Sequence, residues 1–143
     1  MNIVKFLKYN KNRKITVEAW VYCMWYRFVV FNVPMRFLEN HFGIREEETP
    51  EEVTRRDYYW AYRAAYEVNR IADKTPWDSK CLVRALAARK ILLRRGVHTT
   101  LYLGVGTLED KKQMIAHAWL RCGTFYVTGG DGKEYAMVAK FKN

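Results

Sequence analysis

The thiol of Cys81 and the imidazole of His117 are the side chains of this sequence best suited to covalent catalysis. Cys81 is expected in the first turn of a helix, directly after the capping candidates Asp78 and Ser79. The unsatisfied N–H groups and positive dipole end of a helix start stabilise a thiolate, the nucleophilic form of cysteine. A buried structural cysteine is an equally compatible interpretation, because lone cysteines on apolar helices commonly pack in the core.

His117 favours the catalytic interpretation. It lies in a predicted strand between two alanines, whose small side chains leave room for its ring, with Trp119 on the same face. An imidazole beside a thiol can accept its proton and later protonate a leaving amine. A strand histidine on its own is usually just packed and hydrogen-bonded. His41 and His98 lack comparable surroundings and are expected at the surface.

A third residue should orient the imidazole and stabilise its charged form, and Asp131 is our candidate. A hairpin turning near Gly123 would bring residues 128–130 roughly opposite His117, with Asp131 at the end of that neighbouring strand. Glycines on both sides of Asp131 would let the backbone bend its carboxylate inward. An ordinary Asp-Gly turn is the alternative.

Helices must position these residues, and the first is predicted over residues 16–40 with a break or kink at Pro34. The most apolar stretch, residues 17–33, is interrupted by Glu18 and Arg27. This pattern indicates a buried amphipathic helix and not a membrane span.

Two further helices are expected. An acidic loop over residues 43–52 should lead into a helix over residues 50–72, whose first turn would contain acidic side chains. The helix of Cys81 should end at Gly96, after two arginines.

After Gly96 the spacing of the apolar residues changes from helical to alternating. Strands are predicted around residues 101–105 and 115–119, then over 125–127 after a tight turn, and over 135–141. Helices followed by a small antiparallel sheet indicate an α+β fold.

Length and composition indicate one globular domain over residues 1–143, with a helical region at 1–73 and a catalytic core at 74–143. The net charge is +10, and residues 80–143 hold 12 basic against 4 acidic side chains. A basic half could attract nucleic acid, an acidic lipid surface or an acidic peptide, or could simply aid solubility. The three cysteines, Cys23, Cys81 and Cys122, have no paired spacing, which favours a reducing cytoplasm over a disulfide framework.

Several fragments of the second half resemble lasso-peptide leader peptidases in their order and spacing, and together they cover most of residues 76–143. These fragments are residues 81–88, 94–96, 103–106, 116–119 and 128–130.

The resemblance implies a transglutaminase-like or papain-like fold with the triad Cys81, His117 and Asp131 in that chain order. It also implies proteolysis of a ribosomally made precursor, whose released core an ATP-dependent macrolactam cyclase closes into a ring. The family holds the leader with a small recognition domain, either fused or separate. The helical first half has no room for that domain, so we expect a separate leader-recognition protein.

The expected mechanism is acyl transfer to water through an acyl-enzyme, without cofactor or metal. The backbone N–H of Cys81 should contribute to an oxyanion hole, although the papain-type glutamine would fall near Thr75, where there is none. Trp77 and Trp119 could line the substrate cleft, though both residues are more often part of a core.

Three alternatives remain. A transglutaminase-like acyltransferase would use the same triad with an amine as acceptor. A basic binding module without catalysis would fit the charge, but the chain lacks a nucleic-acid-binding motif. A zinc site from Cys81, His117 and Cys122 is disfavoured, because the two strand residues have opposite parity.

Overall fold

The computed structural model describes residues 13–74, 81–107 and 114–143. Within these ranges the helical elements are α2 (Arg13–Asn32), α3 (Met35–Leu38), the 3-10 helix η1 (Glu39–His41), α4 (Arg55–Lys74) and α5 (Cys81–Leu93). The strands are β1 (Ile44–Arg45), β2 (Thr100–Thr107), β3 (Met114–Cys122), β4 (Phe125–Thr128) and β5 (Ala136–Lys142). The fold is α+β, as the sequence predicted.

The strands form one antiparallel sheet in the order β1-β5-β2-β3-β4. The central strand β2 pairs with β3 along its full length and with β5 on its other side. Strands β3 and β4 pair from Cys122–Phe125 to Leu120–Thr128, with a register shift after Leu120. The short β1 was not predicted, because residues 44 and 45 lie in a segment whose acidic composition indicated a loop.

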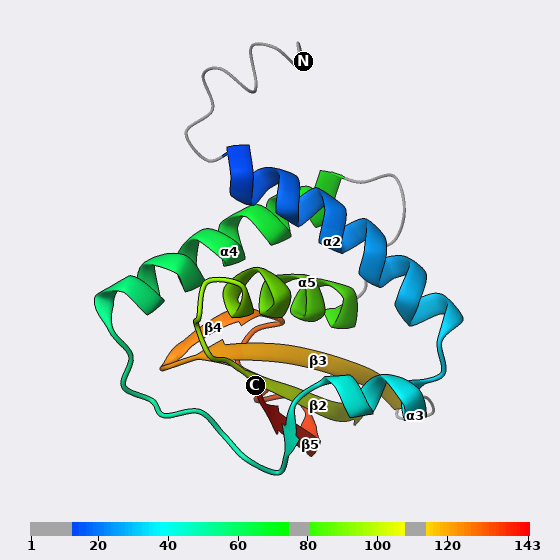
Figure 1. Ribbon diagram of the computed structural model, residues 1–143. Helices are drawn as coiled ribbons and strands as arrows, with labels where there is room; N and C mark the ends of the chain where they lie inside the picture. Colours follow the sequence, from blue (N-terminus) through cyan, green and yellow to red (C-terminus); the bar gives the residue numbers. More distant parts are fainter. Residues whose placement is uncertain (1–12, 75–80, 108–113) are drawn as a thin grey trace.

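Helix α5 lies between the sheet and the helices α2 and α4, which cover it on the side away from the strands (Figure 1). Nine of its 13 residues are buried, among them Arg89. A helix that is apolar nearly all round must be enclosed in this way. The start of α5, where Cys81 lies, is therefore held by packing along the whole helix.

The C-terminal end of α5 is closed by the glycine predicted to end it. Gly96 has a φ of +72° and donates its N–H to Leu93 O at 3.0 Å. Val97 donates its N–H to Leu92 O at 2.9 Å, and both of these side chains are fully buried. This pair of bonds is a Schellman motif with its apolar contact.

Two helix boundaries follow from single residues. Helix α2 ends at Asn32 and α3 starts after Pro34, which confirms the predicted break. Helix α4 starts at Arg55, five residues later than predicted. The reason is a cap: Asp57 donates its N–H to Thr54 Oγ1 at 3.1 Å, and this satisfies a free donor of the first turn.

One face of α2 is apolar and exposed, which corrects the expectation of a helix that buries its apolar residues. Its opposite face does enter the core, through Ile15, Ala19 and Cys23. We call the exposed set the α2 apolar stripe; it consists of Val17, Trp20, Val21, Met24, Trp25, Phe28 and Phe31.

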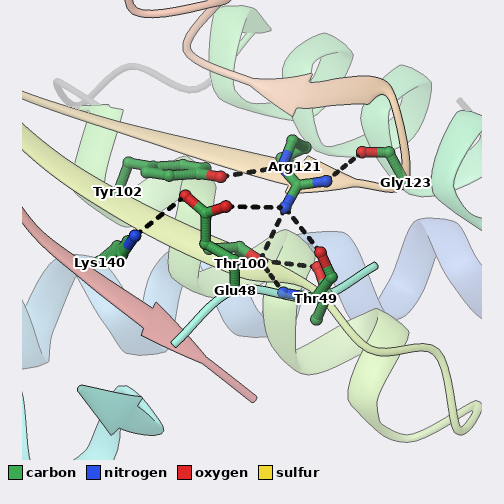
Figure 2. A network of polar contacts seen from close by, with 7 residues as sticks. All are labelled: Glu48, Thr49, Thr100, Tyr102, Arg121, Gly123 and Lys140. Atoms are coloured by element: carbon green, nitrogen blue, oxygen red, sulfur yellow. Dashed lines mark hydrogen bonds and ion pairs between the residues drawn. The ribbon is translucent and has the colours of Figure 1, made fainter. Parts of the chain in front are cut away.

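A buried arginine attaches the loop before α4 to the sheet (Figure 2). Arg121 of β3 donates to Tyr102 Oη and Thr49 O, each at 2.8 Å, and to Gly123 O. Thr100 Oγ1 in turn accepts the N–H of Thr49 at 2.9 Å. Because a guanidinium has five donors in a fixed fork, one side chain here satisfies acceptors from three separate segments.

In the part of the chain that the structure describes, no helix combines the length and apolar character needed to cross a bilayer.

Replacing Arg121 with methionine should lower the free energy of unfolding by about 3–5 kcal/mol, because the buried carbonyl groups of Thr49 and Gly123 lose their donor. Urea denaturation measures the loss. The matched control is Arg36→Met at an exposed arginine of α3, expected to change stability by less than about 0.5 kcal/mol. Equal effects of the two substitutions would show that the network does not stabilise the fold.

Candidate active site

Cys81 lies at the N-terminal end of α5 and reaches β3. Its Sγ accepts the backbone N–H of Ala118 at 3.3 Å. The pairing of β3 with β4 ends at Leu120, two residues away, so this N–H has the thiol as its partner in place of a strand. This bond places the sulfur at the edge of β3, beside His117 in the sequence. The capping candidates before Cys81 lie outside the described residues.

His117 adjoins the thiol's partner Ala118 on β3, and a backbone carbonyl fixes its tautomer. Its Nε2 lies 2.7 Å from Gly129 O. A carbonyl oxygen only accepts, so Nε2 carries the proton and the lone pair of the neutral ring is on Nδ1. The imidazole is thereby prepared to accept a proton at Nδ1.

Cys81 and His117 line one open cleft of about 580 Å³. Its other walls are mostly apolar and come from α2, α3, α5, β2, β3 and β5; they include Val30, Met35, Leu103, Val105 and Val138. Among the described contacts the thiol and the imidazole have no hydrogen bond to each other. Catalytic hydrogen bonds are often long in a free enzyme and tighten when substrate binds. The structure therefore brings the predicted nucleophile and base to the same cleft.

Asp131 lies near His117 but bonds elsewhere. Both residues line a second hollow, of about 470 Å³, formed with the loop from Gly129 to Tyr135. The Asp131 carboxylate accepts the N–H of Lys133 at 3.1 Å and lies 3.6 Å from the Lys133 ammonium. The imidazole nitrogen that a triad carboxylate would accept from is occupied by Gly129 O. The role of Asp131 stays a prediction.

Two partners of His117 were missed from the sequence: the Gly129 carbonyl and the ring of Tyr135, which stacks on the imidazole with centroids 4.3 Å apart. A backbone carbonyl has no sequence signature. Trp119 was expected on the same face as His117, and its ring does lie 5.9 Å away. It is only 4% exposed, so it does not form an open cleft wall, and Trp77 lies outside the described residues.

The other cysteines are core residues. Burial raises the pKa of the Cys23 thiol and of the Cys122 thiol to about 11 each. Cys122 does not line the cleft of Cys81, and the described residues contain no cluster of three or more metal-binding side chains. His41 and His98 are exposed, as predicted.

Comparison with known families matches residues 26–141 to the transglutaminase-like superfamily. The matched region runs from α2 to β5 and contains the cleft residues Cys81 and His117 together with Asp131. Neither the curated proteins nor the solved structures compared with the chain include a significant match.

Iodoacetamide at pH 8 should alkylate Cys81 of the native protein and spare the other two cysteines. With a pKa of about 11, roughly one Cys23 or Cys122 thiol in a thousand is ionised at that pH, and both are also buried. Peptide mass spectrometry locates the adduct, and the urea-denatured protein, in which all three should react, is the control. Preferential labelling of Cys23 or Cys122 in the native state would contradict the assignment.

Proposed function

Because the chain belongs to the transglutaminase-like superfamily, we propose that it is a cysteine peptidase that removes the leader from a ribosomally made lasso-peptide precursor. The observation that carries the proposal is the common cleft of Cys81 and His117, with the proton of the imidazole on Nε2. The superfamily includes cysteine-dependent peptidases and acyltransferases. The resemblance of fragments that cover most of residues 76–143 to leader peptidases supports the processing of a precursor peptide within this class.

In the proposed reaction the Cys81 sulfur attacks the carbonyl carbon of the leader–core bond, and its proton passes to His117 Nδ1. The backbone N–H of Cys81 donates to the oxyanion. The C–N bond then breaks as the imidazolium protonates the leaving amine, which becomes the N-terminus of the core. Water attacks the thioester, gives its proton to His117, and releases the leader as a carboxylic acid and the free thiol.

The apolar cleft supports a peptide substrate. Side chains next to the cleaved bond would lie against walls such as Leu103, Val105 and Met35. Binding sites of this kind combine apolar walls with a few placed polar groups, and here those groups are the thiol and the imidazole. We propose no cofactor for the peptidase reaction. A separate cyclase would then act on the released amine.

The α2 apolar stripe supports a separate recognition partner. Large contiguous apolar surfaces on a folded chain indicate interaction sites, and tryptophan, phenylalanine and methionine are enriched in them. The acidic residue of α2, Glu18, is nearly buried and bound to Arg94 at 2.8 Å and Arg95 at 2.6 Å. We propose that the leader-recognition protein docks on this stripe.

The superfamily also supports a second candidate, an acyltransferase. The same acyl-enzyme would then react with an amine in place of water, and an isopeptide conjugate would be the product.

Incubation of the protein with a precursor peptide and its recognition protein should produce two fragments whose masses sum to precursor plus one water. Cys81→Ala should abolish this hydrolysis, because no acyl-enzyme can form. Including a small primary amine as competing acceptor separates the two candidates by mass. Cleavage that persists in Cys81→Ala would contradict the proposed mechanism. A leader–amine conjugate as the main product would favour the acyltransferase.

Asp131→Asn should lower kcat by about 10- to 100-fold if Asp131 is the acidic member of the triad. This is less than the roughly 10⁴-fold loss known where a carboxylate alone orients the histidine, because Gly129 O already holds Nε2 here. Glu134→Gln, an exposed acid lining the same hollow, is the control and should leave kcat nearly unchanged. Equal rates for wild type and Asp131→Asn would remove Asp131 from the mechanism.

A further inference from the structure

We infer that Tyr135 is a positioning residue for His117: its ring fixes the plane of the imidazole, and its π face stabilises the imidazolium. The inference rests on the proposed role of His117 as the base. It concerns a residue that neither the proposed triad nor the superfamily match assigns.

The imidazole is held by one contact at its edge and one on its face. At the edge, Nε2 lies 2.7 Å from Gly129 O, and this bond limits rotation of the ring within its own plane. Tyr135 covers one face of the ring, with centroids 4.3 Å apart and planes 18° from parallel. Stacking of this kind prevents the ring from tilting. Together the two contacts define where Nδ1 lies.

Tyr135 itself is held in place by backbone. Its N–H donates to Gly132 O at 3.0 Å. Its ring lies over Gly106 of β2, where an added Cβ would come within 2.9 Å of the tyrosine Cδ1. Two residues earlier, a Cβ at Gly104 would come within 2.8 Å of the Trp119 ring. The alternating glycines of β2 thus leave the sheet surface bare where the aromatic side chains lie.

The π face of Tyr135 is a direct electrostatic partner for the ring. Among the described residues, the ionisable groups that line the two hollows beside His117 are Cys81 at the start of α5 and, in the loop, Asp131, Lys133, Glu134 and the Tyr135 hydroxyl. The Asp131 carboxylate lies 3.6 Å from the exposed ammonium of Lys133. The hydrogen-bond partner of the ring, Gly129 O, carries no net charge. A cation over a tyrosine face gains enough to change an equilibrium by roughly 2- to 30-fold.

Alkylation of Cys81 by iodoacetamide, followed from pH 5 to pH 9, tests the inference without any peptide substrate. If His117 stabilises the thiolate as an ion pair, the thiol reacts well below the pH at which it would ionise alone. Tyr135→Ala favours the neutral ring, so its alkylation rate should fall about tenfold near pH 6 and approach that of the wild type near pH 9.

Two further variants distinguish the effect of the aromatic face from the effect of side-chain volume. Tyr135→Phe should react within about twofold of the wild type, because the phenyl face remains. Tyr135→Leu keeps apolar volume without a ring face and should behave like Tyr135→Ala. Tyr126→Ala, at an exposed tyrosine of β4, is the control for removing a tyrosine. An unchanged profile for Tyr135→Ala, or equal losses for Tyr135→Phe and Tyr135→Leu, would overturn the inference.

Gly106→Ala tests the stacking of Tyr135 on His117 by a substitution in β2. The added methyl group should displace the Tyr135 ring and slow alkylation in the wild-type background, but have little further effect on Tyr135→Ala. Additive losses would contradict the inference.

His117→Ala separates this inference from the proposed function. Loss of low-pH alkylation in that variant establishes the activated pair even if no precursor is cleaved, so a wrong substrate does not affect the result. If His117→Ala alkylates like the wild type, the ion pair does not exist and the inference fails with it.

Discussion

The enclosure of α5 is the constraint on which the rest of the structure depends. The helix contacts α2, α4, β3 and β4, and most of its side chains are removed from water. Apolar burial of this extent is the main stabilising term of such a domain. It leaves the helix no freedom to slide or rotate, because any shift would open cavities on several sides. Cys81 is therefore placed against β3 by the whole core, and its thiol also accepts the bond from Ala118.

The second constraint is the point where β4 leaves the sheet. If β4 had continued to pair with β3 past Leu120, the N–H of Ala118 would belong to a strand ladder. Instead the chain turns at Gly129, whose φ of +78° and close approach to Ala118 O exclude a side chain. The same turn points the Gly129 carbonyl at His117. One departure from regular pairing thus produces a site for the thiol and a hydrogen-bond acceptor for the imidazole.

Patterns local to a segment were predictable from the sequence, whereas contacts between distant segments were not. The alternation of Leu101, Leu103 and Val105 predicted β2, and Gly96 predicted the end of α5, since each depends on neighbouring residues alone. The start of α4 was placed too early, because acidic residues near Pro50 suit a first turn as well as a loop. The cap at Thr54 sets the start of α4, and the tertiary network of Arg121, which holds the carbonyl of Thr49, attaches the preceding segment to the sheet. An arginine in a strand otherwise indicates an exposed position.

At the candidate active site, too, the side chains were predictable from the sequence and their tertiary partners were not. This difference concerns the group that orients His117. Residue types and chain order pointed to Cys81 and His117, because thiol and imidazole chemistry belongs to side chains. The partner that holds the imidazole is a carbonyl, which any residue could supply, so sequence favoured the nearby carboxylate of Asp131. A carbonyl orients a ring as well as a carboxylate does, but it offers no countercharge to an imidazolium. In the proposed mechanism the countercharge comes from Cys81, which lines the same cleft and becomes negative when its proton passes to His117. An ion pair formed in this way would stabilise the proposed nucleophile and base together, and Asp131 would add to it rather than supply the whole countercharge.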